Sequence, residues 1–498
     1  MVYRSPPVVS TLGQTSRVNA PLCTIVWFRR DLRVADHPAL SAAADRGDVV
    51  ALFVLDPALL VKRHHTSTER LTFLRSGLEA LDGELRARGI SLTVRSGDPR
   101  LVISDLAREV GADQVHITRE ISGFGRGRDD AVVEALAGQG AALVEFGGDL
   151  VVEPLDLPGS SGAGYQVFTP FYRAWQEHPL PPHDPGPVML TGPALVSDGL
   201  GALPTGESLI PAGPAAAREK LAEFVRSGAV EKYGARRNSV AEVGTSQISP
   251  YLRFGMCTGA QIGRALRVGG ELPSGRGSFW RQVAWREFFH HLAARRPDVL
   301  RQSLREDLRD IQWNEDDDGF VAWKAGRTGY PIVDAAMRQL LETGWMHNRT
   351  RMVVASFLVK DLLIDWRRGE THFMQHLLDG DPASNNGGWQ WVAGTGADAA
   401  PYFRVFNPTL QGQKFDPDGT YVRRYVAELA SVPTKRIHEP WLMTDLEQMD
   451  SSCRIGTDYP APIVDHRERR AEVLDRYRAA REVAGAPESG DSEVRESG

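Results

Sequence analysis

The sequence has no run of 18 apolar residues anywhere in its 498 residues. A helix that crosses a membrane needs about 20 such residues, so no membrane span is predicted. Residues 1–20 are polar and contain proline without the apolar core of a signal peptide, and we expect a disordered leader there. The only cysteines, Cys23, Cys257 and Cys453, lie far apart, which excludes a disulfide framework or a zinc site and predicts a reduced, cytoplasmic protein.

Lysine is also scarce, since it accounts for only seven of the 58 lysine and arginine residues. The excess of arginine is compatible with a GC-rich genome, and it is equally compatible with forked recognition of phosphate groups, which arginine performs better than lysine. The formal net charge of −6 argues against a protein that coats nucleic acid non-specifically.

Several motifs of nucleotide and hydrolase chemistry are missing. The sequence contains no GxxxxGKS/T, GxGxxG, HExxH or GxSxG motif, so a P-loop ATPase and a dinucleotide fingerprint are excluded. The paired histidines at 64–65 and 290–291 lack metal-ligand spacing, because neighbours on a helix point to different faces. No metal site is predicted.

Apolar segments alternate with amphipathic ones in the first part of the chain. The strand-like segments are 24–28, 49–55, 91–95, 114–118 and 142–146, and the helical segments between them are 38–46, 68–88, 100–110 and 128–137. Short apolar strands that alternate with helices predict βαβ units around a parallel sheet. In open sheets of this kind, ligands bind beyond the carboxyl ends of the strands.

Composition divides the chain into five segments. They are a leader at 1–20, an α/β domain at 21–150, a connector rich in Pro, Gly and Ser at 151–214, a helical domain at 215–481, and a disordered acidic tail at 482–498. An aromatic segment of the connector, Phe168–Trp175, is expected to dock on the folded core.

Polar residues stand beside clustered tryptophans in the segment 328–408. Asp379, Asp381 and Asn385 are unusual in an aromatic-rich helical domain, because buried polar groups need partners. A bound, planar and polar cofactor would supply them. Upstream, the segment 244–249 places hydroxyl side chains and backbone N–H groups before a helix, which suits a pyrophosphate. Ser and Thr are also ordinary helix caps, so this segment has two explanations.

These segments together closely resemble the DNA photolyase/cryptochrome family, and within it the bacterial class I photolyases that repair cyclobutane pyrimidine dimers. The likeness extends from Trp27-Phe-Arg-Arg-Asp-Leu-Arg33 to Tyr459-Pro-Ala-Pro-Ile-Val464. It implies an α/β N-terminal domain with a Rossmann-like, doubly wound parallel sheet, followed by an all-α FAD-binding domain.

The resemblance implies a folded FAD within the helical domain. The residues that match its contacts are Tyr233, Thr245, Ser246, Gln247, Ile248, Ser249, Arg286, Trp345, Asn348, Arg351, Asp379, Asp381 and Asn385. Asp379 would pair with Arg351, which makes a buried acid tolerable. Asn385 would face flavin N5, where family members that sense light often carry Asp or Cys, so Asn favours repair over signalling.

Three tryptophans, Trp313, Trp366 and Trp389, match the family's chain for photoreduction of the flavin. Indoles oxidise readily, and several short electron hops are faster than one long step. Any single tryptophan is more simply explained as a core side chain, and the assignment of this trio therefore rests on the resemblance.

The resemblance also implies a pocket for a flipped-out lesion, because damaged bases cannot be reached within a duplex. The matching residues are Arg237, Gln282, Trp285, Asn348, Arg349, Met352 and Trp391. Trp285 and Trp391 would stack on the bases, and Arg237 and Arg349 would hold the DNA backbone.

Two positions bear on the choice of lesion. Relatives that repair (6-4) photoproducts carry His at the positions of Asn348 and Met352, so these residues point to cyclobutane dimers. Gln282 is a departure, because bacterial dimer photolyases usually have Glu there and (6-4) enzymes have Gln. Gln both donates and accepts but carries no charge, which predicts altered repair efficiency.

An antenna chromophore is a further expectation for the α/β domain. Phe124-Gly125 replaces the Asn-Glu pair of folate-binding members, so folate is disfavoured. The surrounding glycine and arginine residues resemble members that use an 8-hydroxy-5-deazaflavin, with Arg70, Glu120 and Arg128 at the matching positions. Ion pairs around an empty cleft are the alternative.

The resemblance thus implies light-dependent repair of cyclobutane pyrimidine dimers by electron transfer from excited, reduced FAD to a flipped-out dimer. The alternatives are a blue-light-sensing cryptochrome without repair activity and a (6-4) photolyase. The expected partner is damaged DNA, and we expect a monomer.

Overall fold

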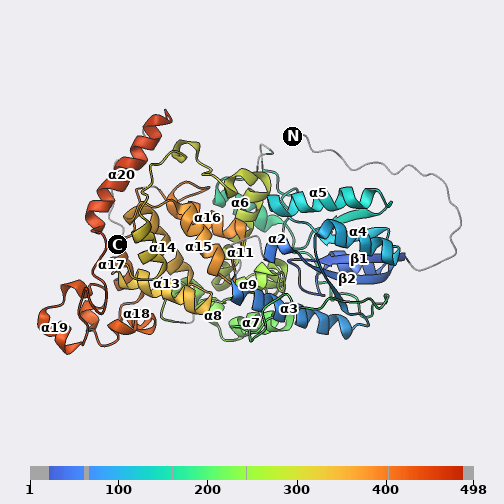
Figure 1. The fold of residues 1–498 in the computed structure, drawn as a ribbon, viewed down its shortest axis with the longest axis horizontal. Coiled ribbons are helices and arrows are strands. Elements are labelled where there is room, and N and C mark those ends of the chain that lie inside the picture. The colour runs from blue at the N-terminus through green and yellow to red at the C-terminus, as the bar shows by residue number, and fades with distance from the viewer. Residues whose placement is uncertain are drawn as a thin grey trace.

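The computed structural model describes residues 22–485, except 61–66, 160, 161, 163, 243 and 402. An α/β part and a helical part lie at opposite ends of the molecule (Figure 1). The predicted leader and residues 486–498 of the predicted tail lie outside the described residues. No helix of the described chain is long and apolar enough to cross a membrane.

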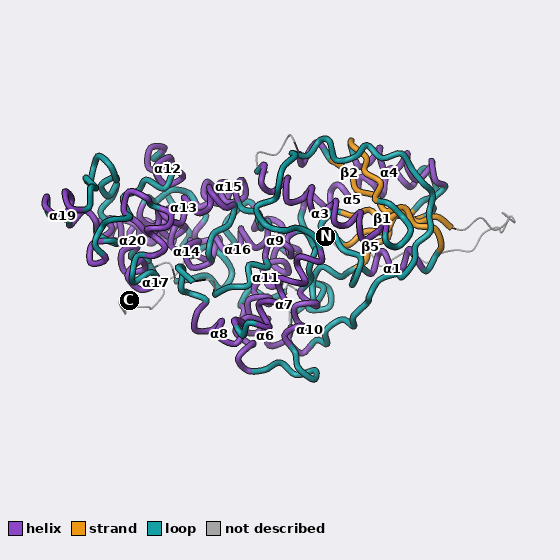
Figure 2. Tube along the Cα trace, turned by 90° about the horizontal axis from the view of Figure 1, so that it is seen from below, coloured by secondary structure: helices purple, strands orange, loops and turns teal. Residues whose placement is uncertain are grey.

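All five predicted strands are present in one parallel sheet of order β3-β2-β1-β4-β5. Their bounds are β1 (Leu22–Phe28), β2 (Gly47–Leu55), β3 (Leu92–Ser96), β4 (Gln114–Thr118) and β5 (Ala142–Phe146). The strands are confined to one end of the molecule (Figure 2). The chain order reverses between β1 and β4, which are paired with Ile25 opposite Val115.

Side-chain alternation along β1 divides the sheet into two buried faces. Val26 and Phe28 belong to one core with α1 (Pro38–Ala44) and α3 (Thr68–Arg86). Ile25 and Trp27 belong to another core with α4 (Pro99–Val110) and α5 (Gly123–Ala137). Alternate side chains of β1 therefore point to opposite faces of the sheet, and helices cover both faces. This confirms the predicted doubly wound architecture. The short helix α2 (Pro57–Leu60) follows β2.

One helix begins earlier than predicted. The sequence pattern placed the start of α5 at residue 128, whereas the structure places it at Gly123. The Ser122 hydroxyl accepts a hydrogen bond from the Gly125 amide at 3.0 Å and so caps the first turn. Apolar periodicity did not predict this first turn, because residues 123, 125 and 127 are glycines.

The connector covers the edge of the sheet, and its aromatic segment docks on the helical part. Leu190 and Asp198 donate backbone hydrogen bonds to Arg88 and Val94, near the exposed edge of β3. The aromatic segment forms α6 (Phe168–Glu177), whose Phe168 is fully buried and stacks on Trp285 with a centroid distance of 3.8 Å.

The remaining chain is helical, as predicted. Its helices are α7 (Pro214–Arg226), α8 (Ala229–Arg236), α9 (Ser249–Arg253), α10 (Gly259–Leu266), α11 (Gly277–Arg295), α12 (Asp317–Lys324), α13 (Pro331–Thr343), α14 (Asn348–Ser356), α15 (Trp366–His376), α16 (Pro382–Ala393), α17 (Pro408–Phe415), α18 (Thr420–Tyr425), α19 (Asp445–Asp450) and α20 (His466–Val483). The apolar core on the α1 and α3 face continues into α11, so both parts of the molecule share it.

Glu287 fastens α11 to the connector by a fully buried carboxyl group. It accepts hydrogen bonds from the backbone amides of Val151 (2.7 Å) and Val152 (3.3 Å) and from the indole of Trp175 (2.6 Å). Burial nevertheless raises the pKa of Glu287 to about 7.

This shift predicts a pH-dependent stability. The unfolded chain releases the Glu287 proton near its ordinary pKa of 4.5, whereas the folded protein retains it up to about pH 7. Relative to Glu287→Gln, the free energy of unfolding of the native protein should fall by about 3 kcal/mol between these two pH values. Urea unfolding at the two pH values measures this, with the exposed Glu134→Gln as control. Equal pH dependence in both variants would contradict the prediction.

Candidate functional site

Two cavities lie in the region where ligands are expected. The first, which we call the interdomain cavity, has a volume of about 870 Å³. Its wall contains Arg29 and Arg30, which follow β1, and Glu120, which follows β4. It therefore lies at the carboxyl ends of the strands where the sheet order reverses, the usual ligand position in doubly wound sheets. Residues of α3, α9 and α15 complete the wall.

The second cavity, which we call the central cavity, lies within the helical part and has a volume of about 350 Å³. All thirteen residues predicted to contact FAD line it: Tyr233, Thr245, Ser246, Gln247, Ile248, Ser249, Arg286, Trp345, Asn348, Arg351, Asp379, Asp381 and Asn385. Residues up to 152 positions apart in the sequence thus meet at one cavity.

Asp379 and Asp381 belong to the loop between α15 and α16. Asp379 accepts a hydrogen bond from Arg351 at 2.9 Å and is buried, so the predicted ion pair is present. Asp381 accepts from Arg30 at 2.5 Å and lies 3.3 Å from the ring nitrogen of His290. Although burial acts to raise it, the charges of His290 and Arg30 hold the pKa of Asp381 well below its usual range.

Helix α16 presents one continuous face to the central cavity. The lining residues Asp381, Ser384, Asn385, Gly388 and Trp389 recur at helical spacing. Asp381 caps the helix by accepting from the Ser384 amide at 2.9 Å. The Asn385 amide group donates to the Glu370 backbone oxygen at 3.0 Å, which fixes its orientation and leaves its carbonyl oxygen for a ligand.

The 245–249 segment differs from the expected helix start. Helix α9 spans only five residues, so its N-terminal dipole is small. The chain turns at Gln247 with a φ of 51°, a left-handed conformation that non-glycine residues rarely adopt. Residues 245–249 line the cavity, and its wall also contains the cationic side chains of Arg253, Arg286 and Arg351.

Comparison with known families agrees with this geometry. A family model described as DNA photolyase matches residues 24–188, and one described as the FAD binding domain of DNA photolyase matches residues 279–479. The chain belongs to the DNA photolyase family. It is an enzyme of that family, with an FAD-binding domain around the central cavity.

Curated relatives match over nearly their whole length. The deoxyribodipyrimidine photo-lyase of Agrobacterium fabrum is 40% identical over 476 residues, which cover 92% of this chain and 98% of that protein. The corresponding proteins of Streptomyces griseus and Escherichia coli are 41% and 39% identical, over 90% and 92% of this chain and 97% and 98% of theirs.

Solved structures extend the likeness to the fold. A class III photolyase from Agrobacterium tumefaciens has a TM-score of 0.87 at 38% identity, covering 94% of this chain and 99% of that one. A Synechocystis cryptochrome has a TM-score of 0.85 at 30% identity, covering 92% of this chain and all of that one. The family thus includes both repair enzymes and cryptochromes of this fold.

The central cavity has the unsatisfied groups that a polar cofactor would complete. Asp379 Oδ1, Arg286 Nη1 and Arg253 Nη1 are buried without a hydrogen-bond partner among the described residues. Gly388 lies on the cavity wall, and a Cβ there would meet nothing within 4 Å. These features suit FAD, which has both polar edges and a flat ring. No three His, Cys, Asp or Glu side chains in the described ranges are placed to hold a metal ion.

The residues predicted for the lesion divide into two groups. Gln282, Trp285, Asn348 and Met352 line the central cavity itself. Trp285 is held by its stack on Phe168, so its position depends on the docked connector. Trp391, Arg237 and Arg349 are not part of that lining; Trp391 is partly exposed and follows Trp389 by two residues on α16.

Three arginines form a positive cluster in the helical part. Burial and the neighbouring charges of Arg237 and Arg404 lower the pKa of Arg349 to about 10. Arg349 donates to the Asn238 side chain at 2.9 Å and packs over Phe415 at 4.5 Å. Sequence reasoning missed Arg404, although it lies within the segment 328–408.

The three predicted redox tryptophans belong to or pack against one apolar core and differ in exposure. Trp389 is buried and lines the cavity, Trp366 is fully buried, and Trp313 is partly exposed. Helices α15 and α16 approach closely at Gly369, where a Cβ would lie 2.2 Å from the Trp389 ring. Sequence reasoning missed Trp323, which is fully buried and packs edge-on against Trp389 at 6.2 Å.

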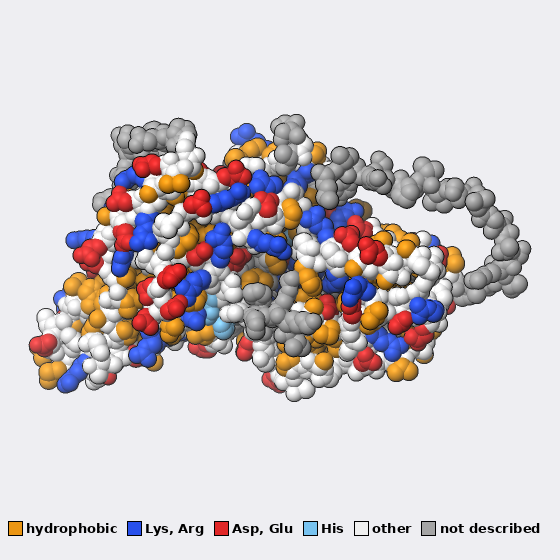
Figure 3. Space-filling model, turned by 45° about the horizontal axis from the view of Figure 1, so that its top comes forward, with side chains coloured by type: hydrophobic (Ala, Val, Ile, Leu, Met, Phe, Trp, Pro, Cys, Tyr) orange, Lys and Arg blue, Asp and Glu red, His pale blue; other side chains and the backbone are white. Residues whose placement is uncertain are grey.

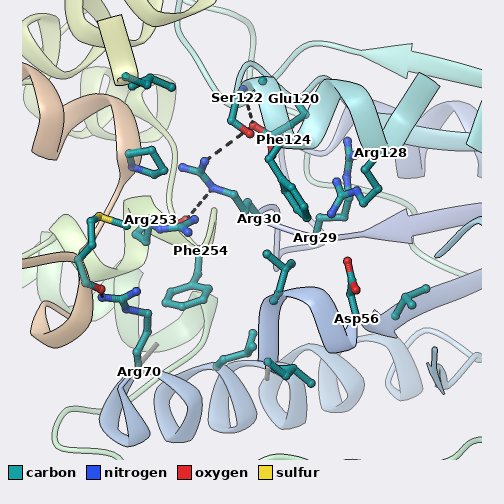
Figure 4. Close-up of a pocket in the computed structure, with 18 of the residues that line it drawn as sticks. Arg29, Arg30, Asp56, Arg70, Glu120, Ser122, Phe124, Arg128, Arg253 and Phe254 are labelled. Atoms are coloured by element: carbon teal, nitrogen blue, oxygen red, sulfur yellow. Dashed lines mark hydrogen bonds and ion pairs between the residues drawn. The ribbon is translucent and has the colours of Figure 1, made fainter. Parts of the chain in front are cut away.

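The residues predicted for an antenna, Arg70, Glu120 and Arg128, all line the interdomain cavity (Figure 4). Although burial acts to raise it, the charges of Arg30 and Arg29 lower the pKa of Glu120 to about 2. Arg128 packs 4.6 Å from the Trp27 ring. Arg70 donates to the backbone oxygens of Leu377 and Met374, so its donors hold the loop that follows α15.

The pair of Arg351 and Asp379 can be tested by removing its cation. Arg351→Gln leaves a buried carboxylate without its counter-charge, and we expect a loss of about 2 kcal/mol in the free energy of unfolding. In an Asp379→Asn background the same substitution should cost less, because no charge is left unpaired. Urea unfolding of the four proteins measures the coupling, and purely additive losses would contradict it.

Proposed function

We propose that this chain repairs cyclobutane pyrimidine dimers in DNA by light-driven electron transfer. The observation that carries the proposal is that residues matching the FAD contacts and residues matching the lesion contacts line the same cavity. Bound, reduced FAD would supply an excited-state electron that splits the cyclobutane ring and then returns. The side chains would bind and orient the dimer and keep water out.

Asn348 and Met352 support a dimer as the lesion. They lie one turn apart on α14, with the Asn348 amide nitrogen 3.8 Å from the Met352 sulfur. This edge of the cavity offers one amide and one soft apolar group without an imidazole, whereas a (6-4) enzyme carries His at both positions. Gln282 would hydrogen-bond the edge of a flipped-out base as donor and acceptor, without the negative charge of the usual Glu.

Binding of DNA would depend on the lesion more than on the duplex. Basic and acidic side chains are interspersed over the face in Figure 3. The cluster of Arg237, Arg349 and Arg404 would bind a few phosphates of the DNA backbone. The resulting affinity for DNA would be limited and would fall with salt concentration. Stacking of the flipped bases on Trp285 and Trp391 would supply the preference for damaged DNA.

Asn385 supports repair over signalling by a cryptochrome. Its amide nitrogen is already engaged by the Glu370 backbone oxygen, so its carbonyl oxygen is the group that would accept from flavin N5–H. A neutral acceptor favours the reduced cofactor that repair requires.

The tryptophan chain would serve to reduce the flavin. The indole nitrogens of Trp389 and Trp366 are buried without a hydrogen-bond partner among the described residues, so an oxidised ring there has no proton acceptor. Trp313 would then donate an electron to the oxidised ring. Because Trp313 is partly exposed, its own oxidised ring would lose a proton to water.

The interdomain cavity would hold an antenna, and we propose an 8-hydroxy-5-deazaflavin there. Arg29, Arg30 and Arg128 surround Glu120 on its wall, and Phe53 and Phe124 offer flat apolar surfaces. A photolyase structure from Sulfolobus tokodaii, with a TM-score of 0.80 at 31% identity, is described with two FAD molecules that imply a novel light-harvesting cofactor. Mass spectrometry of the extracted chromophores distinguishes a deazaflavin from a second FAD and from folate.

We further propose the class I subtype, a cytoplasmic location and a monomer. The pair Asn348 and Met352 supports the subtype through dimer specificity, whereas the fold is also that of a class III photolyase. The three cysteines are buried and unpaired, as a reduced compartment requires.

Repair of defined lesions tests the proposed function. The purified, chemically reduced protein should restore a thymine-dimer oligonucleotide under blue light and leave it unchanged in the dark. It should leave a (6-4) photoproduct oligonucleotide unchanged. Absence of any repair would favour a cryptochrome, and repair of the (6-4) lesion alone would favour that class.

Trp313→Phe tests the tryptophan chain separately. Phenylalanine is much harder to oxidise than tryptophan, so we expect photoreduction of the oxidised flavin to be about tenfold slower. The rate is measured from the loss of flavin absorption under blue light with a thiol present. Repair by the chemically reduced variant should be unchanged. Trp441→Phe, which lies outside the cavity lining, is the control. Equal photoreduction rates in both variants would contradict the assignment.

A further inference from the structure

The loop between α15 and α16 separates the two cavities. Leu377, Asp379, Gly380 and Asp381 of this loop line the central cavity. Three arginines that line the interdomain cavity hold the same loop, and one of them, Arg253, lines the central cavity as well. These arginines come from three distant elements: Arg30 follows β1, Arg70 lies on α3 and Arg253 lies on α9.

Each arginine binds a different point of the loop. Arg30 donates to the Asp381 carboxylate at 2.5 Å, Arg253 to the Gly380 backbone oxygen at 2.6 Å, and Arg70 to the Leu377 backbone oxygen at 2.8 Å. Arg30 is the member that comes from the sheet of the α/β part, and it is the one that engages a side chain of the flavin cavity.

Arg30 lies between charges of both cavities. Its guanidinium is 3.9 Å from the Glu120 carboxylate on the antenna side, and its Nε donates to the Arg253 backbone oxygen at 3.4 Å (Figure 4). Asp381 in turn caps α16, the helix that presents Asn385 and Trp389 to the central cavity. A displacement of Arg30 would therefore be transmitted to the start of α16.

We propose that Arg30 is a positioning residue for the flavin, acting from the α/β domain through Asp381. Its fork fixes the loop and the N-terminus of α16, so that Asp379, Asp381 and Asn385 are already in place when FAD binds. The proposal rests on the proposed function only in that the central cavity binds FAD. It requires neither repair nor an antenna.

The affinity of the apoprotein for FAD in the dark tests this role, measured by quenching of flavin fluorescence. Arg30→Gln should weaken FAD binding about tenfold, which is a typical coupling between two sites. Arg29→Gln is a matched control, because Arg29 also lines the interdomain cavity but forms its ion pair with Asp129 inside the α/β part. Equal FAD affinity in the two variants overturns the proposal.

Two further measurements separate positioning from general destabilisation. In an Asp381→Asn background, Arg30→Gln should cause a smaller additional loss of FAD affinity than in the native protein, because the ion pair is already gone. Arg30→Lys keeps the positive charge but loses the planar guanidinium with its several N–H donors. Its affinity for FAD should lie between those of the native protein and Arg30→Gln. If Arg30→Gln does not fold, Arg30→Lys decides: weaker binding than native supports the role, and native affinity overturns it. If the FAD affinities are as expected but the protein does not repair dimers, only the proposed function is contradicted.

Discussion

The central cavity is built around the buried carboxylates of Asp379 and Asp381. Two carboxylates within three residues, both shielded from water, are costly to bury unless cations stand beside them. Arg351 supplies one cation from within the helical part, and Arg30 supplies another from the α/β part. The cofactor cavity is thus assembled from both parts of the chain, which gives the α/β domain a structural role at the flavin in addition to any role as an antenna carrier.

The same constraint organises α16. Because Asp381 caps the helix, the residues one, two and three turns later face the cavity, and these include Asn385, Gly388 and Trp389. The opposite face carries Asn386 and Gln390, which are hydrogen-bonded to each other at 2.9 Å and anchor the helix to its neighbours. In the proposed function, one helix would therefore combine an amide for the flavin, open space for its ring and the first indole of the electron path. Its polar residues on the other side are hydrogen-bonded within the protein.

The sequence predicted the sheet well because its signal is local. Strands such as 114–118 and 142–146 stand out as short apolar runs, and the structure has them at those bounds. The start of α5 was missed because glycines interrupt the apolar pattern and only the Ser122 cap reveals it. The residues that match FAD contacts were found through long motifs and line one cavity. The contacts of Arg30 and Arg70 with the same loop could not be predicted, since they join positions more than 300 residues apart. The contact of Trp323 with Trp389 was hidden for the same reason, because packing between helices leaves no mark in a local pattern.

The central claim is that one cavity brings the flavin and a flipped-out dimer into contact. A crystal structure of the reduced, FAD-loaded protein with thymine-dimer DNA measures this directly. The account predicts the flavin ring against α16 with the Asn385 carbonyl oxygen at hydrogen-bond distance from N5, and the dimer beside it between Trp285 and Trp391. A dimer that remains stacked in the duplex, or a flavin bound away from Asp379 and Asp381, would contradict it.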